Sequence, residues 1–169
     1  MSPTTTFLPV TSAADISTVA VLASEIWNEY YVSLIGQAQV DYMVAKFQSV
    51  EAMQEQIRNG YQYFLMQYDG APVGYLAVQP QPAQASLFIS KLYLHRNARG
   101  SGTGRAAMAF IEELARQQGF GRLWLTVNKG NPAIQAYERL GFRVAEAIVM
   151  DIGNGYVMDD FRMEKSLSS

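Results

Sequence analysis

Three glycines alternate with other residues in the segment Arg99-Gly100-Ser101-Gly102-Thr103-Gly104. The segment joins an apolar, strand-like run, Ser86 to Leu94, to an amphipathic helical pattern, Arg105 to Gln118. Glycines at such a junction let the backbone approach a bulky anion closely, and the helix N-terminus offers free N–H groups and the positive end of its dipole. Because Arg99 and Arg105 add full charges, the segment indicates a phosphate or pyrophosphate site.

Two common nucleotide motifs do not fit this segment. A P-loop requires Gly-Lys followed by Ser or Thr, whereas Gly104 is followed by Arg105-Ala106. A dinucleotide fingerprint requires G-x-G-x-x-G, and the spacing here is G-x-G-x-G. The remaining alternative is a turn that binds nothing, but each helical glycine costs about 1 kcal/mol, which disfavours three of them without a role.

Composition narrows the class of protein. The chain has 169 residues, 49% hydrophobic and 17% charged, which predicts a single globular domain over residues 1–169. It contains no cysteine, which excludes disulfides and a cysteine nucleophile, and its one histidine makes a metal site unexpected. The net charge of -2 argues against nucleic acid as a partner. We expect a cytoplasmic protein that does not associate with membranes, because no signal peptide or membrane-length apolar stretch is visible.

Periodicity predicts elements in the order strand, helices, three strands, helix, strand, helix, two strands. The expected strands are Thr5 to Val10, Tyr61 to Tyr68, Pro72 to Val78, Ser86 to Leu94, Leu123 to Val127, Phe142 to Ile152 and Tyr156 to Glu164. The expected helices are one capped by Ser12 or Asp15 and reaching Tyr30, then Ala38 to Phe47, Val50 to Asn59 capped by Ser49, Arg105 to Gln118, and one from Asn131-Pro132 to Gly141. Gln79 to Pro82 is expected to be a loop, and a bulge is expected near Ser90 or Lys91. The result is an α/β chain with a mixed sheet and helices on both faces.

The sequence resembles the GNAT superfamily of acetyl-CoA-dependent N-acetyltransferases. The family signature is Arg or Gln, two residues, Gly, one residue, then Gly or Ala, here Arg99, Gly102 and Gly104. The preceding run Lys91 to His95 is similar to the family's central strand, and Asn131 to Phe142 is similar to its second cofactor motif. The resemblance covers roughly residues 86–143. It implies a mostly antiparallel central sheet with one splayed parallel pair.

The resemblance also implies roles for individual residues. The pyrophosphate of coenzyme A would lie against the segment from Arg99 to Arg105, and the pantetheine arm against Leu92, Tyr93 and Leu94. Asn131 would cap its helix and contact the cofactor arm. Tyr137 would lie near the sulfur and act as general acid, because a phenol and a thiolate leaving group have roughly similar basicity. Packing in the helix face is the alternative for Tyr137. The cofactor-site residues are thus Leu92, Tyr93, Leu94, Arg99, Gly100, Ser101, Gly102, Thr103, Gly104, Arg105, Asn131 and Tyr137.

The general base is less defined. Some family members use a glutamate on the central strand, but no acid occurs between Asp69 and Glu112 in this chain. Glu29, near Tyr30 and Tyr31 at the end of the first long helix, is the candidate, with a solvated helix-face charge as its alternative. His95 is interpreted as a surface residue, and the pair Asp159-Asp160 as a solvated strand edge that could instead face the acceptor.

Charge is unevenly distributed along the chain. Residues 1–90 carry two basic and seven acidic side chains, whereas residues 91–131 carry seven basic and two acidic ones. A basic cofactor region beside acidic helices favours a cationic acceptor, such as a polyamine, an amino-sugar or a peptide amine. The prediction is an N-acetyltransferase acting on a primary amine. A non-catalytic acyl-CoA sensor and an enzyme with another acyl donor or an oxygen acceptor remain the alternatives, and the oligomeric state stays open, with a homodimer among the options.

Overall fold

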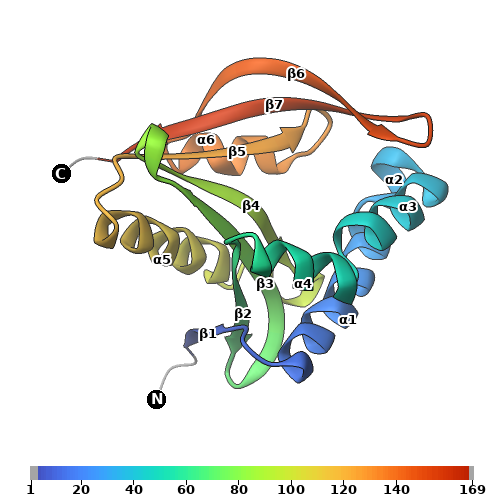
Figure 1. The fold of residues 1–169 in the computed structure, drawn as a ribbon, viewed down its shortest axis with the longest axis horizontal. Coiled ribbons are helices and arrows are strands. Elements are labelled where there is room, and N and C mark those ends of the chain that lie inside the picture. The colour runs from blue at the N-terminus through green and yellow to red at the C-terminus, as the bar shows by residue number, and fades with distance from the viewer. Residues whose placement is uncertain (1–3, 168–169) are drawn as a thin grey trace.

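A computed structural model describes residues 4–167, which build one seven-stranded sheet in the order β1-β2-β3-β4-β5-β7-β6. The strands are β1 (Thr5–Pro9), β2 (Gln62–Tyr68), β3 (Ala71–Gln81), β4 (Ser86–Leu94), β5 (Arg122–Asn128), β6 (Arg143–Gly153) and β7 (Tyr156–Ser166). The helices are α1 (Ala13–Tyr30), α2 (Val32–Ile35), α3 (Gln37–Phe47), α4 (Val50–Arg58), α5 (Thr103–Gln117) and α6 (Ala133–Arg139), with short 3-10 turns η1 (Pro82–Gln84) and η2 (Arg96–Ala98). The predicted element order and α/β class are confirmed (Figure 1).

The pairing of β4 with β5 differs from every other strand pairing in the sheet. All neighbours in the sheet are antiparallel except β4 and β5, which run parallel and pair only where Ser86–Phe88 meets Arg122–Trp124. Beyond these residues the two strands diverge, as Figure 1 shows. Within the described residues, the rest of β4 therefore has a partner strand only on its β3 side.

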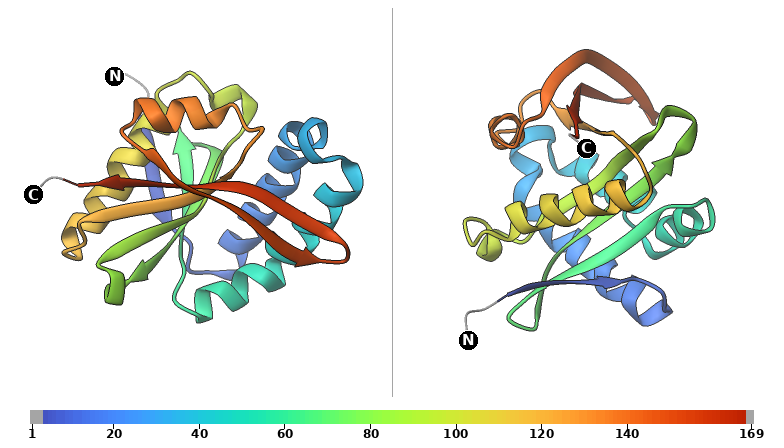
Figure 2. Two further views of the ribbon diagram at one scale, coloured as in Figure 1. Left: turned by 90° about the horizontal axis from the view of Figure 1, so that it is seen from above. Right: turned by 90° about the vertical axis from the view of Figure 1, so that its left-hand side faces the viewer.

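Helices cover both faces of the sheet (Figure 2). Helices α1, α3 and α4 pack on one face against a cluster that includes Trp27, Tyr63 and Tyr75. Helix α5 packs on the other face through residues such as Ile111, against Leu87 and Leu123. Each helix thus buries the apolar stripe that its sequence periodicity predicts. Within residues 4–167, no helix combines the length and apolar character needed to cross a membrane.

Local signals fixed several helix ends as expected. The Ser12 hydroxyl accepts a hydrogen bond from the Asp15 backbone N–H at 3.1 Å, and the Asp15 carboxylate accepts one from the Ser12 N–H, which forms a capping box for α1. Ser49 caps α4 by accepting from the Ala52 N–H at 3.2 Å. These caps satisfy N–H groups that the first helical turn leaves free.

The predicted loop at Gln79–Pro82 was wrong. Strand β3 continues to Gln81, and its last residues pair with the start of β4. The reversal happens instead at η1 and at Ala85, which takes a left-handed φ of 49°. The two prolines favoured a loop in the sequence, but continued pairing with β4 keeps the chain extended past Pro80.

The predicted bulge lies at Ser90. Ala77 pairs with Lys91 and Val78 pairs with Ile89, so Ser90 has no opposite residue on β3. A bulge changes which face the following side chains point to. Before it, Ile89 belongs to the α5 side of the sheet, whereas after it Lys91 and Tyr93 face the α1 side. The bulge therefore turns the second half of β4 toward the space between the diverging strands.

Candidate active site

The glycine segment forms an open cradle at the N-terminus of α5. Gly100 and Gly102 have φ values of +83° and +88°, in the left-handed region that glycine adopts without strain. A Cβ at either position would meet no atom within 4 Å, so the backbone borders open space rather than packed protein. This space is a cavity of about 530 Å³ lined by Leu94, Arg99, Gly100, Ser101, Gly102, Gly104 and Arg105. Its size, backbone N–H groups and two arginines fit a pyrophosphate.

Side-chain hydrogen bonds hold the cradle in shape. The hydroxyls of Ser101 and Thr103 lie 2.7 Å apart, and the Thr5 hydroxyl donates to that of Thr103 at 3.4 Å. Thr103 is fully buried. These hydroxyl contacts therefore hold the loop in shape, while the backbone of Ser101 and Thr103 remains at the cradle.

Glu29 packs against the arginines beside the cradle. Its carboxylate accepts from the Arg96 backbone N–H at 3.1 Å and is 3.7 Å from a guanidinium nitrogen of Arg99. The Arg99 side chain also donates to the Leu94 carbonyl at 2.9 Å and lies 4.6 Å from the centre of the Tyr30 ring. Glu29 does not line either cavity, and its carboxylate instead contacts Arg96 and Arg99.

His95 also lies outside the two cavities. Its Nδ1 accepts from the Asn97 backbone N–H at 3.4 Å at the start of η2, and its Nε2 is 3.9 Å from the Glu25 carboxylate. This placement agrees with its interpretation as a surface residue. Within residues 4–167, no cluster of three or more His, Asp or Glu side chains could hold a metal ion.

A second cavity of about 1090 Å³ opens where β4 and β5 diverge. It shares Leu94, Arg99, Gly104 and Arg105 with the cradle, so the two spaces adjoin each other. Residues from α1, α3, α4, β4, β5, α6 and the β6–β7 hairpin line it, many of them aromatic or aliphatic. The unpaired edge of β4, with Leu92, Tyr93 and Leu94, runs along this cavity. An extended ligand arm can therefore pass from the cradle along β4.

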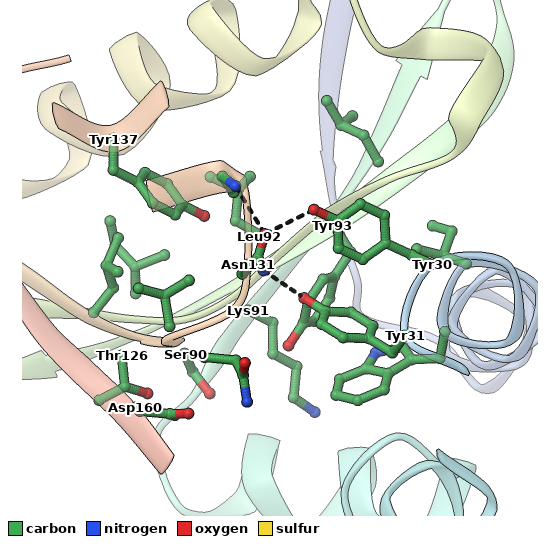
Figure 3. A pocket seen from close by; sticks show the side chains of 18 of the residues that line it. Tyr30, Tyr31, Ser90, Lys91, Leu92, Tyr93, Thr126, Asn131, Tyr137 and Asp160 are labelled. Carbon is green, nitrogen blue, oxygen red and sulfur yellow. Dashed lines mark hydrogen bonds between the residues drawn. The ribbon is translucent and has the colours of Figure 1, made fainter. Parts of the chain in front are cut away.

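Asn131 ties three segments together at this cavity (Figure 3). Its side-chain oxygen accepts from the Ala133 backbone N–H at 2.8 Å and from the Tyr30 hydroxyl at 2.7 Å. Its amide group donates to the Tyr31 hydroxyl at 3.4 Å. The predicted cap is confirmed, although the helix begins at Ala133, so Pro132 comes just before its first turn.

Tyr137 on α6 points its hydroxyl toward the same cavity (Figure 3). Its ring packs edge to face on Phe142 at 5.8 Å between centroids. The tyrosine hydrogen bonds to Asn131 at this cavity come from Tyr30 and Tyr31 and do not involve the Tyr137 hydroxyl. Burial raises the pKa of Tyr137 to about 12, so the phenol keeps its proton throughout the neutral range. The arrangement leaves that proton available to a bound ligand.

Lys91, after the bulge on β4, is a buried cation that sequence reasoning did not single out. It is 5% exposed, and its ammonium donates to the Phe47 carbonyl, to the Gln56 side-chain oxygen at 3.0 Å and to the Tyr63 hydroxyl. Burial lowers the pKa of Lys91 to about 7. Its three N–H groups are thus satisfied by neutral acceptors of the protein, at a cost in desolvation of the charge.

This environment predicts a pH-dependent stability. In the unfolded chain Lys91 keeps its proton up to its ordinary pKa of 10.5, whereas in the folded chain it loses the proton above about 7. Between these values the unfolded state binds more protons, so stability rises with pH. We expect the unfolding free energy of wild type, relative to Lys91→Met, to rise by about 2 kcal/mol between pH 7 and pH 9. Urea titrations followed by tryptophan fluorescence would measure this difference, and parallel pH profiles of the two proteins would contradict it.

The burial of Asp160 on β7 shows that one interpretation of the sequence was wrong. The pair Asp159-Asp160 was interpreted as a solvated strand edge, but only Asp159 is exposed, at 56% of its side chain, and it pairs with Lys129 at 2.7 Å. Asp160 is 1% exposed and lines the large cavity. The last strand of the chain lies inside the sheet, between β5 and β6, and not at its edge. The order of the strands in the sequence does not show that β7 lies between β5 and β6 in the sheet.

The acidic side chains of the N-terminal helices do not line the large cavity. Among the described residues that line the large cavity, Asp160 is the one acid, whereas Glu25 and Glu29 face the basic η2 region. The charge split between the two halves of the chain is therefore partly neutralised within the protein. It does not create the acidic acceptor wall that the sequence indicated.

Comparison with known proteins assigns the family. Residues 22–142 match the model of the acetyltransferase (GNAT) family. Streptothricin acetyltransferase of Streptomyces lavendulae is 40% identical over 75 residues, which cover 44% of this chain and 40% of that protein. The uncharacterized N-acetyltransferase YjgM of Escherichia coli (strain K12) is 29% identical over 157 residues, 90% of each chain.

The fold agrees with this assignment. The crystal structure of the PaiA N-acetyltransferase from Thermoplasma acidophilum, a complex with coenzyme A, superposes with a TM-score of 0.78 at 19% identity, over 98% of this chain and 99% of that one. The chain belongs to the acetyltransferase (GNAT) family, whose members are acetyl-CoA-dependent acyltransferases.

Proposed function

We propose that this protein transfers an acetyl group from acetyl-CoA to the primary amine of a cationic small molecule or peptide. The observation that carries the proposal is that the two cavities adjoin. An anion cradle at the α5 N-terminus lies next to a large, mostly apolar cavity that is lined by a protonated phenol, Tyr137, and a carboxylate, Asp160. Donor and acceptor can therefore meet at one site.

On the donor side, the backbone N–H groups from Gly100 to Gly104 hold the pyrophosphate, helped by Arg99 and Arg105. The free edge of β4 receives the pantetheine arm through backbone hydrogen bonds. This placement directs the thioester toward Tyr137. When the amine attacks the thioester carbonyl and the carbon–sulfur bond breaks, Tyr137 gives its proton to the sulfur.

On the acceptor side, the aromatic rings of Trp27, Tyr30, Tyr31 and Tyr93 line the large cavity. Tyr30 and Tyr31 pack edge to face at 4.9 Å, and Tyr93 packs on Trp27 at 5.4 Å. Rings of this kind attract an organic cation wherever a face is open to the cavity. The partial similarity to streptothricin acetyltransferase supports a cationic acceptor as well, over less than half of that protein.

The test measures binding and turnover separately. Calorimetry with acetyl-CoA should give a saturable site. Thiol release should then be followed with streptothricin, spermidine, 1,4-diaminobutane, glucosamine, a lysine-containing peptide and glutamate. We expect the cationic amines to be acetylated at least tenfold faster than glutamate. Binding without turnover on any amine would support an acyl-CoA sensor instead, and absence of binding would overturn the donor site.

A further inference from the structure

Asp160 has an unused hydrogen-bonding atom. It is 1% exposed, and its Oδ1 has no hydrogen-bond partner among residues 4–167. Figure 3 shows its carboxylate beside Thr126 and Ser90, at the wall of the large cavity formed by β5 and β7. Because a buried carboxylate without a partner costs several kcal/mol, the missing partner is expected to come from a ligand.

Among residues 4–167, no cation forms an ion pair with Asp160. Its charged and titratable neighbours are Asp159 on β7, Lys129 at the end of β5 and Tyr93 on β4. Lys129 is paired with Asp159 at 2.7 Å, and β6 contributes only Ile148 opposite Asp160. Burial, with a smaller contribution from Asp159, raises the pKa of Asp160 to about 6, so the carboxylate is ionised at neutral pH and accepts protons readily.

Lys91 is the other buried charged group that lines this cavity. The hydrogen-bond donors of its ammonium already have partners. Its three N–H groups donate to Phe47, Gln56 and Tyr63. It therefore has no donor left for a substrate in this arrangement. Asp160 differs because it lines the cavity and its Oδ1 has no hydrogen-bond partner among the described residues.

We propose that Asp160 is the catalytic residue of the acceptor side, where its carboxylate binds the ammonium group of the acceptor and removes the proton that blocks attack. This role rests on the proposed acetyl transfer and adds to it the group that receives the amine. It also replaces Glu29, which the structure ties to Arg96 and Arg99.

The protons balance over the reaction. The acceptor ammonium gives one proton to Asp160, and the freed nitrogen lone pair forms the bond to the thioester carbon. The carbon–sulfur bond breaks, its electron pair stays on sulfur, and Tyr137 protonates that sulfur. The second proton of the attacking nitrogen returns to Tyr137, and Asp160 releases its proton to solvent. The products are the amide, the free thiol and one proton.

The test compares Asp160→Asn with wild type on the amine from the panel above that wild type acetylates fastest. We expect kcat/KM at pH 7 to fall by about 10²–10⁴, the range for loss of a general base. Above the pKa of Asp160, wild type should be nearly independent of pH up to the pKa of the amine. The variant should instead rise about tenfold per pH unit, because it can use only amine that is already neutral.

Asp159→Asn is the matched control, because it changes the same residue type one position along β7 on the exposed side. It should keep the activity of wild type at pH 8. It should also move the acidic limb of the profile to lower pH, since it removes a like charge and frees Lys129 to act on Asp160.

Two binding measurements separate this inference from the proposed function. Acetyl-CoA should bind Asp160→Asn within twofold of wild type, which also shows that the variant is folded. With coenzyme A bound, 1,4-diaminobutane should bind wild type at least tenfold more tightly than the variant. Equal diamine affinity, or a variant that keeps kcat within twofold with the pH profile of wild type, would overturn the role of Asp160. Loss of acetyl-CoA binding by wild type would instead overturn the donor site.

Discussion

Replacing Gly102 with glutamate should weaken acetyl-CoA binding at least about 100-fold, because a carboxylate would occupy the cradle that receives the pyrophosphate. The backbone at Gly102 has a φ of +88°, and a side chain there would extend into the open cavity without meeting an atom within 4 Å. The fold can therefore accept the residue at a cost of about 1–2 kcal/mol for a left-handed non-glycine residue. Calorimetry with acetyl-CoA, alongside thermal unfolding, would measure both effects.

Gly119→Glu supplies the control for this variant. Gly119 follows the C-terminus of the same helix, has a φ of +77° and also borders open space. The substitution introduces the same backbone strain and the same charge at the opposite end of α5. We expect a similar loss of stability with unchanged cofactor affinity. If Gly102→Glu bound acetyl-CoA as Gly119→Glu does, the cradle assignment would be wrong.

The second large effect concerns the phenol of α6. Tyr137→Phe should lower kcat about 10²-fold or more while the dissociation constant of acetyl-CoA changes less than threefold. The ring keeps its edge-to-face contact with Phe142, and only the proton donor is lost. Steady-state thiol release at saturating amine, together with calorimetry, separates the two quantities.

The pH dependence of this variant offers a further check. With its pKa raised to about 12, Tyr137 stays protonated across the assay range and should contribute no limb to the wild-type profile below pH 9. The expected loss is therefore the same factor at every pH from 6 to 9. Equal losses in kcat and in cofactor affinity would show instead that Tyr137 acts through packing.

Much of the fold followed from local signals. Helix caps at Ser12 and Ser49, the bulge at Ser90 and the element order were predictable because each depends on residues close together in the chain. The loop predicted at Gln79–Pro82 failed because the pairing of β3 with the start of β4 is a contact the local pattern does not encode. The same distinction holds for the site.

The sequence by itself predicted the donor side. Arg99 and Gly102 come just before α5 and Gly104 lies in its first turn, so spacing alone places their backbone at the helix N-terminus, and the motif indicates the ligand class. Asn131 precedes α6, and Tyr137 lies within it. The positions of these residues depend on local geometry, which the order of amino acids specifies directly.

Only the tertiary structure decided the acceptor side. The strand order puts β7 between β5 and β6, which buries Asp160 and exposes Asp159, although the two are neighbours in the chain. Folding also brings Glu29 against Arg96 and Arg99, and away from the cavity where the sequence placed it. The burial and partners of a charged side chain depend on segments distant in sequence, and these determine which carboxylate lacks a hydrogen-bond partner among the described residues.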